Sequence, residues 1–312
     1  MSEQQRRSTD VDYIGVDIGG TKISVCLGGQ KGQVDWNVRF DTKGNPGEVL
    51  DDIHQAITEA IGHANRPVGA IGIACGGPLD SARGIIQSPP NLPGWDNIPI
   101  VQVLTDAFHV PVYLENDANA CALAEWYWGN GKGFSSVIFL TFGTGLGAGL
   151  ILDGRLYRGV SGLSGEVGHW RLSSEGPTCY GKQGSWESFC SGAGISRLYE
   201  AKTGRLTTAK EICDLAERHD LVASHVIQES AVMLGRGLAL LVDLLNPERI
   251  IIGSIFSRSE ALFRETMERE LRQEALTQTA SRCSVTVSAL QERLGDMAAL
   301  GIARNYYKEY VR

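Results

Sequence analysis

The chain has 312 residues, a length that corresponds to about two domains at roughly 150 residues each. Hydrophobic residues make up 43% and charged residues 21% of the chain, which excludes a disordered protein and a coiled coil. The formal net charge of −7 gives no general attraction to nucleic acid or to an anionic membrane, so neither is an expected partner. Glycine is the unusual component, because 38 of 312 residues are glycine, about 12% against a typical value near 7%.

The sequence carries no signal for export or membrane insertion. Its N-terminal residues, MSEQQRRSTD, lack an apolar segment, and no uncharged apolar run approaches the roughly 18 residues of a membrane span. The seven cysteines are an odd number and stand singly among apolar or small neighbours, as reduced buried thiols do. We therefore expect a cytoplasmic protein.

Short buried strands around glycine-threonine turns open each half of the chain. Strands are expected, in chain order, at residues 13–17, at 23–27, from Val34, at 137–141 and at 148–152. The first turn holds Gly19, Gly20, Thr21 and Lys22, and the second holds Gly143, Thr144 and Gly145. Because the same strand and turn pattern occurs twice, the sequence predicts two related α/β lobes.

Helices are expected after each group of strands. Apolar residues at three- and four-residue spacing predict them at 46–64, 118–128, 226–245, 259–275 and 296–310, with a buried strand at 249–253. This alternation indicates mixed sheets flanked by helices. Since no linker composition separates the lobes, we place the small lobe at 1–120, with the helix near 296–312 returning to it, and the large lobe at 121–295.

The two glycine-threonine turns place backbone N–H groups and hydroxyls where a phosphate could bind, although a glycine turn can also simply join two strands. Two other phosphate motifs fit poorly. Gly15–Gly20 has the spacing of a P-loop, but Thr21-Lys22 reverses the required order and no helix follows. Gly143–Ala148 matches a dinucleotide fingerprint, but a strand is expected after it where that motif needs a helix.

Two further segments carry candidate chemistry. Asp117 follows a strand that ends in polar residues, a place where ligands gather in open α/β sheets, and is a candidate general base. Its alternative role is to cap the next helix, a role that Asn116 could also take. In the glycine-rich segment 158–169, Glu166 and His169 could bind a small polar ligand, or the segment could be a solvated surface loop.

Six segments in order resemble the ROK family of bacterial sugar kinases, repressors and open reading frames, within the actin-like ATPase superfamily. They are Asp17–Lys22, Gly76–Pro78, Ser88–Gly94, Glu115–Asn119, Thr141–Gly145 and Gly159–His169. The resemblance covers essentially the whole chain. It implies an α/β fold of two actin-like (ribonuclease H-like) lobes, with mixed sheets flanked by helices and an active-site cleft between the lobes.

The resemblance also implies ATP-dependent phosphorylation of a free hexose at its 6-hydroxyl, as in glucokinases, with Asp117 as the general base and Asp17 placing Mg²⁺ through water. It assigns the ATP phosphates to Gly19, Gly20, Thr21, Lys22, Thr141, Gly143, Thr144 and Gly145, and adenosine to Gly253 and Ser254. It assigns the sugar to Gly77, Asn91, Asn116, Asp117, Glu166, His169 and Glu187. The family often has glycine where Ser254 stands, and relatives are commonly homodimers.

Other functions stay open at this level. The sugar could be N-acetylglucosamine, N-acetylmannosamine, fructose or a phosphorylated glucoside. A different class is the sugar-sensing regulator, in which a helix-turn-helix precedes the same fold; about twelve residues precede the first expected strand here, too few for that module. A third option is a sugar-binding module without catalysis, which the retained Asp17, Asp117 and glycine turns argue against.

One segment departs from the family pattern. Many members hold structural zinc with a histidine and the motif C-x-C-G-x-x-G-C-x-E, but here the three cysteine positions hold Thr178, Tyr180 and Ser185. We therefore expect no zinc, because structural zinc sites use four nitrogen or sulfur ligands. A minority alternative combines Cys179 and Cys190 with His169. Without zinc, packing of Trp170, Tyr180 and Trp186 is expected to hold the loop 172–184.

Overall fold

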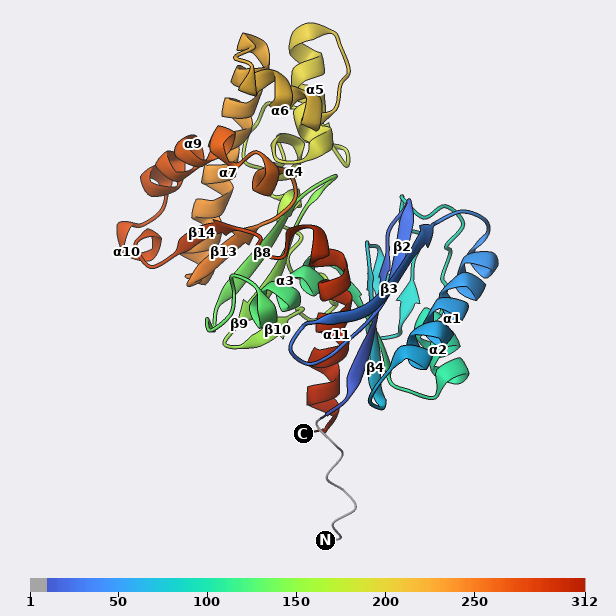
Figure 1. Cartoon of the computed structure of the whole chain (residues 1–312). Helices are drawn as coiled ribbons and strands as arrows, with labels where there is room; N and C mark the ends of the chain where they lie inside the picture. The colour runs from blue at the N-terminus through green and yellow to red at the C-terminus, as the bar shows by residue number, and fades with distance from the viewer. Residues whose placement is uncertain (1–9, 312) are drawn as a thin grey trace. The chain divides into compact units, whose positions relative to one another are not determined.

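The computed structural model describes residues 10–311, in two compact units (Figure 1). Within these residues, the first unit runs to Gly129 and resumes at Glu292, and the second unit is Asn130–Gln291. The boundary expected near residue 120 falls inside helix α3 (Asp117–Trp128), and the first unit ends only after that helix. No composition change marks this junction, which is why the sequence placed it imprecisely.

The first unit is a five-stranded mixed sheet with helices on both faces. Its elements are β1 (Asp12–Ile18), β2 (Lys22–Gly28), β3 (Val34–Asp41), α1 (Pro46–His63), β4 (Val68–Cys75), β5 (Leu79–Asp80), β6 (Ile85–Ile86), α2 (Ile100–Phe108), β7 (Val112–Asn116), α3 and, after the second unit, α11 (Leu294–Val311). The strand order is β3-β2-β1-β4-β7. β1 to β3 pair antiparallel, whereas β4 and β7 are parallel to β1.

The second unit repeats this topology. Its elements are β8 (Val137–Phe142), β9 (Leu146–Leu152), β10 (Arg155–Tyr157), the 3-10 turn η2 (Val167–His169), β11 (Thr178–Cys179), β12 (Lys182–Gln183), α4 (Trp186–Phe189), α5 (Gly192–Thr203), α6 (Ala209–Glu217), α7 (Leu221–Leu245), β13 (Arg249–Ile252), α8 (Ile255–Arg258), α9 (Glu260–Glu274), α10 (Thr277–Ala280) and β14 (Ser284–Val287). The sheet order β10-β9-β8-β13-β14 has the same pattern of antiparallel and parallel pairs as the first sheet. The predicted duplication is therefore confirmed.

The first strand carries different side chains to the two faces of its sheet, because successive residues of a strand alternate. Ile14, Val16 and Ile18 join the core beneath α1, while Tyr13 packs with residues of α11. Figure 1 shows α1 and α11 on opposite faces of this sheet. Asp17 follows Tyr13 on the α11 side, so the strand period places its carboxylate at the beginning of that helix.

α11 approaches the sheet closely because glycine lies beneath it. An added Cβ at Gly15 would lie 2.9 Å from Cβ of Ala299, and one at Gly72 would overlap the Ala299 carbonyl oxygen. The close approach fixes the beginning of α11 relative to the end of β1.

The second unit has one large core, in which α7 packs against α9 and which also contains buried residues of β8 and β13. α7 begins at Leu221 and not at the expected residue 226, because the Asp220 side chain caps it by accepting the Ala223 N–H at 2.8 Å. Among residues 10–311, no helix is both long and apolar enough to cross a lipid bilayer.

Candidate functional site

The first glycine-threonine turn joins β1 to β2, as predicted. Gly19 N–H donates to the Lys22 carbonyl at 3.0 Å, which closes the turn. The N–H groups of Gly20 and Thr21 have no acceptor within the described part of the chain, and Thr21 is exposed. Two adjacent backbone N–H groups that are available as donors can bind an anion, so this turn is suited to a phosphate. A strand and not a helix begins at Lys22, as expected from the sequence, so the segment is not a P-loop.

Asp117 lies at the junction of β7 and α3. The Asn116 side chain accepts the Ala118 N–H at 2.9 Å and is the N-cap of the helix, so the capping role considered for Asp117 belongs to its neighbour. Asp117 is the first helical residue, and its Oδ1 also accepts the Ala118 N–H, at 2.8 Å. The residue is exposed, so its carboxylate is accessible to a ligand.

Two asparagine side chains lie with this carboxylate near the glycines that follow β4. An added Cβ at Gly76 would lie 3.9 Å from both terminal atoms of Asn91 and 4.0 Å from Asp117 Oδ2, so the two side chains face the same glycine. An added Cβ at Gly77 would lie 3.8 Å from Asn116 Nδ2. Asn91 also lies against the first turn, because a Cβ at Gly20 would lie 2.5 Å from its carbonyl oxygen. The first unit thus brings its predicted sugar residues together beside its predicted phosphate turn.

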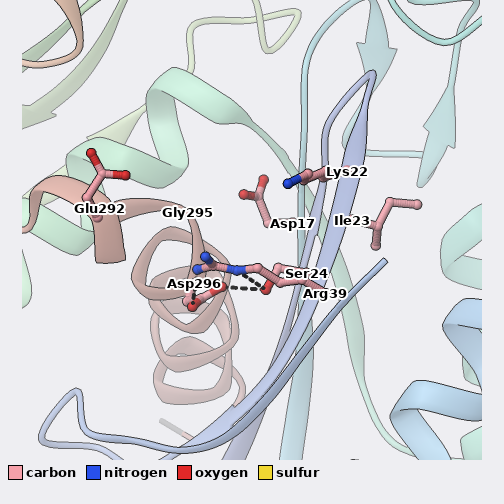
Figure 2. Close-up of a pocket in the computed structure, with 8 residues that line it drawn as sticks. All are labelled: Asp17, Lys22, Ile23, Ser24, Arg39, Glu292, Gly295 and Asp296. Atoms are coloured by element: carbon pink, nitrogen blue, oxygen red, sulfur yellow. Dashed lines mark hydrogen bonds and ion pairs between the residues drawn. The ribbon is translucent and has the colours of Figure 1, made fainter. Parts of the chain in front are cut away.

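A cavity of about 220 Å³ opens beside Asp17 (Figure 2). It is lined by Asp17, Lys22, Ile23, Ser24, Arg39, Glu292, Gly295 and Asp296. Asp296 is 5% exposed and accepts hydrogen bonds from Ser24 Oγ at 2.6 Å and from Arg39 at 2.9 Å. Sequence reasoning missed Asp296; the available signal was one acidic residue at the start of a helix whose other residues are apolar or glycine as far as Ala303.

The site around Asp17 combines burial with an excess of negative charge. Burial raises the pKa of its carboxyl to about 6, with Asp117 and Asp296 adding to the rise and Arg39 opposing it. A divalent cation would offset this excess of negative charge, so the site fits Mg²⁺. Among residues 10–311, no three His, Cys, Asp or Glu side chains gather around a possible metal position. Asp17 could therefore supply one ligand, directly or through water, with the remaining ligands coming from water and phosphate.

Gly295 is expected to be intolerant of a side chain. An added Cβ there would overlap Asp17 Oδ2. We expect Gly295→Ala to lower kcat/KM for MgATP by about tenfold, because it displaces this carboxylate. Gly62→Ala is the matched control, since nothing lies within 4 Å of its added Cβ in α1; it should stabilise the protein by up to about 1 kcal/mol with unchanged kinetics. Equal kinetics for the two variants would contradict this role of Gly295.

The second glycine-threonine turn joins β8 to β9. Gly143 N–H donates to the Gly145 carbonyl at 3.1 Å, while the N–H groups of Thr144 and Gly145 have no acceptor in the described residues. Thr141 Oγ1 accepts the Gly147 N–H at 2.9 Å and braces the turn from inside. This arrangement repeats that of the first turn. Because strand β9 follows, the dinucleotide motif is excluded, as expected from the sequence.

Ser254 follows β13 and lies beside the second turn. A Cβ at Gly143 would be 3.5 Å from Ser254 Oγ. The backbone of Ser254 has φ 57° and ψ −116°, a conformation that glycine adopts far more readily than serine. The structure therefore gives a physical reason for the glycine that the family often has here.

We expect Ser254→Gly to raise the free energy of unfolding by about 1 kcal/mol, because it removes this backbone strain. Ser254→Ala removes the hydroxyl but keeps the strain, and should not stabilise the protein. Urea denaturation of the three proteins compares these values. Equal stability of the glycine and alanine variants would contradict the assignment of strain.

The other predicted sugar residues of the second unit differ in exposure. Glu187 is 9% exposed, and its Oε2 accepts the Leu146 N–H at 2.9 Å, directly after the second turn. An added Cβ at Gly145 would lie 3.0 Å from the same oxygen. Glu166 and His169 flank and end η2 and are both exposed. The second unit thus brings Glu187 against its phosphate turn, and presents Glu166 and His169 to solvent.

In the described structure, the segment that departs from the zinc pattern makes other contacts at the positions in question. Ser185 is the N-cap of α4. Cys190 is fully buried and its thiol donates to the Ser230 carbonyl at 3.3 Å, whereas Cys179 contacts Glu187. The minority set of Cys179, Cys190 and His169 is therefore not gathered among the described residues, and the donors present do not fit tetrahedral zinc.

The packing expected for the loop 172–184 is correct only in part. Trp170 and Trp186 stack, with ring centroids 5.9 Å apart and planes at 18°. Tyr180 is wrong as a member of that cluster, because it is 70% exposed and stacks on His169. Tyr180 lies at the tip of a hairpin, where its backbone φ is 50°.

Comparison with known proteins agrees with these features. The sequence pattern of the ROK family matches residues 13–305. A glucokinase of Halalkalibacterium halodurans is 30% identical over 91% of this chain and 92% of its own, and a xylose repressor of Bacillus spizizenii is 28% identical over 96% of this chain and 78% of its own.

Solved structures give the same result. A ROK hexokinase from Thermus thermophilus matches with a TM-score of 0.88 and 31% identity, covering 96% of this chain and all of that one. A ROK family glucokinase from Streptomyces griseus in complex with glucose and AMPPNP matches with a TM-score of 0.75 and 30% identity, covering 94% and 99% of the two chains. The fold is thereby shown to be the actin-like fold of ROK sugar kinases, as the sequence predicts.

Proposed function

Because the chain belongs to the ROK family, we propose that it transfers the terminal phosphoryl group of ATP to the 6-hydroxyl of a free hexose, with glucose as the first candidate. Similarity to glucokinases over nine-tenths of the chain supports a sugar kinase. The observation that carries the proposal is the accessible Asp117 carboxylate, which faces Gly76 together with the Asn91 amide, beside the first phosphate turn.

In this reaction Asp117 acts as the general base. As the sugar 6-oxygen forms a bond to the γ-phosphorus, Asp117 accepts the hydroxyl proton and the bond to the β-γ bridging oxygen breaks, which releases ADP. Phosphoryl transfer asks for little covalent chemistry from the protein, so catalysis rests on alignment of the two substrates and on stabilisation of phosphate charge. Mg²⁺, when bound near Asp17, would supply part of that stabilisation.

Each unit carries one glycine-threonine turn that is suited to phosphate. The open N–H groups at Gly20 and Thr21 in one unit, and at Thr144 and Gly145 in the other, are suited to hold the phosphates. Gly253 and Ser254 would adjoin the adenosine.

Paired polar groups would recognise the sugar. A pyranose presents a ring of hydroxyls, each both donor and acceptor, and the amides of Asn91 and Asn116 and the carboxylates of Glu166 and Glu187 can pair with them. His169 would complete the set. A sugar that leaves such groups unpaired binds more weakly, so the same residues would set specificity. Fructose and N-acetylated hexosamines are the alternative acceptors.

The proposal also covers the cellular location and the oligomeric state of the protein. All seven cysteines are without disulfides, which suits a reducing cytoplasm where ATP is available. We propose a homodimer on the basis of family resemblance alone. The similar xylose repressors favour one alternative of another class, a regulator that binds a sugar without phosphorylating it.

Coupled ADP release across a panel of free sugars tests the proposal. We expect release that depends on sugar and MgATP, fastest with glucose or a close hexose. Titration calorimetry with the same sugars separates the alternatives. Sugar binding without sugar-dependent ADP release would contradict the kinase and support the regulator.

A further inference from the structure

A short hairpin, residues 178–183, occupies the segment where zinc-containing relatives differ from this chain. β11 and β12 pair antiparallel, and the two turn residues, Tyr180 and Gly181, have φ of 50° and 70°. Positive φ at both positions is the pattern of the tight two-residue turns that connect antiparallel strands. Arg197 of α5 donates to the Thr178 carbonyl at 2.7 Å, which ties the hairpin to that helix.

The first contact of this hairpin is with Glu187. The Cys179 thiol lies 2.9 Å from Glu187 Oε1, and the Leu146 N–H donates to Oε2 at 2.9 Å. One carboxylate oxygen is therefore held by the hairpin and the other by the residue that follows the second phosphate turn. Burial, followed by the hydrogen bond to Glu187, raises the pKa of the Cys179 thiol to about 11, so it remains protonated and a donor at neutral pH.

The second contact is with His169. The Tyr180 and His169 rings stack with centroids 5.1 Å apart and planes at 27°, and Lys182 Nζ donates to the His169 carbonyl at 2.6 Å. Tyr180 is 70% exposed, so burial in a core does not explain its position. Adjacent residues of one hairpin thus hold a carboxylate and an imidazole that are far apart in the sequence.

We propose that Cys179 and Tyr180 are positioning residues of the sugar site, which orient Glu187 and His169 through a hydrogen bond and a ring stack without a metal ion. This inference rests on the proposed function, because it takes both residues as sugar partners. The hairpin would orient these two side chains by protein contacts, as a metal-bound loop would by ligation. Such support matters because the geometry of a binding site depends on the groups that hold its ligand-contacting side chains in place.

Two pairs of variants separate positioning from a general structural role. Cys179→Ala removes the donor to Glu187, whereas Cys179→Ser keeps a donor of similar size. Tyr180→Leu removes the ring, whereas Tyr180→Phe keeps it. Cys283→Ala is the control, because Cys283 lies outside the hairpin, where its side chain packs against the core of the second unit and its thiol contacts the Ser284 carbonyl at 4.0 Å.

The expected result is selective for the sugar. In Cys179→Ala and Tyr180→Leu we expect the glucose Kd, measured by calorimetry, and the glucose KM to rise about fivefold or more. The KM for ATP and kcat should stay within about twofold of wild type, and the serine, phenylalanine and Cys283 variants should match wild type. Unchanged glucose affinity in both disruptive variants, or failure of serine and phenylalanine to restore it, would overturn the proposal.

Two measurements do not depend on catalysis. The ring-proton resonance of His169, assigned with His169→Gln, should shift in Tyr180→Leu but not in Tyr180→Phe, because stacking on an aromatic ring changes its chemical shift. Elemental analysis should find no zinc retained by the wild-type chain. An unshifted His169 resonance, or one zinc per chain that is lost in Cys179→Ala, would overturn the proposed positioning of His169 and Glu187 by the hairpin. Absence of sugar-dependent ADP release in the wild type would instead contradict the kinase, while these two results still decide the hairpin contacts.

Discussion

Replacement of Asp117 by asparagine is expected to lower kcat about 10³-fold, while the sugar Kd changes by less than about threefold. Asparagine has nearly the same shape and can still accept the Ala118 N–H that Asp117 accepts in the structure, so the beginning of α3 should be preserved. It cannot accept the proton of the sugar hydroxyl. Loss of turnover with retained sugar binding is the signature of a general base.

Asp106→Asn provides the matched control for this change. Asp106 is exposed on α2 and its carboxylate accepts a hydrogen bond from Gln102 within the same helix. Its replacement removes one negative charge from the same unit, so both kcat and the sugar Kd should remain at wild-type values. A turnover in Asp117→Asn within tenfold of this control would refute the assigned base.

Replacement of Asp17 by asparagine is expected to have opposite effects on activity and stability. kcat/KM for MgATP should fall by about 10²-fold or more, because the carboxylate proposed to place Mg²⁺ is lost. The free energy of unfolding at pH 7.5 should rise by up to about 3 kcal/mol, because a buried charge beside two other carboxylates is removed.

The sign of the stability effect follows from the Asp17 pKa. That pKa is raised from 3.8 to about 6 in the folded protein, so the folded state holds this proton more tightly than the unfolded chain does. The contribution of Asp17 to stability is therefore fully present below about pH 4 and is lost as the pH rises through about 6. In urea denaturation between pH 4 and 8, the free energy of unfolding of Asp17→Asn should increase relative to that of wild type as the pH rises. A constant difference across the window would contradict the raised pKa.

The sequence contained most of the information for the two sheets and the two turns. Each strand of β1–β2 and β8–β9 is a short apolar run bounded by glycine, so periodicity and turn chemistry agree and the duplicated topology follows. The carboxylate at Asp117 could be singled out for the same reason, because it stands where a buried strand ends. The local sequence pattern was sufficient to predict those elements whose local preference agrees with their place in the fold.

Contacts between segments that are distant in the sequence could not be predicted from the local sequence pattern. The acid at Asp296 becomes part of the site only because α11 returns to β1 and places it beside Ser24, 272 residues earlier. The bond between Cys179 and Glu187 depends on a hairpin of two-residue strands, too short for any periodic signal. Likewise, the strained φ of Ser254 cannot be read from the residue itself, since serine is common in ordinary turns.

The most direct test of the central claim is ³¹P NMR of wild-type protein with MgATP and glucose. The account predicts that the γ-phosphate signal of ATP is replaced by the signals of ADP and of one sugar monophosphate. The phosphorus of that sugar phosphate should couple to two protons, as expected for a phosphate on the CH₂ group of the 6-position. Persistence of ATP with every hexose tested, or conversion of ATP to ADP and inorganic phosphate alone, would contradict it.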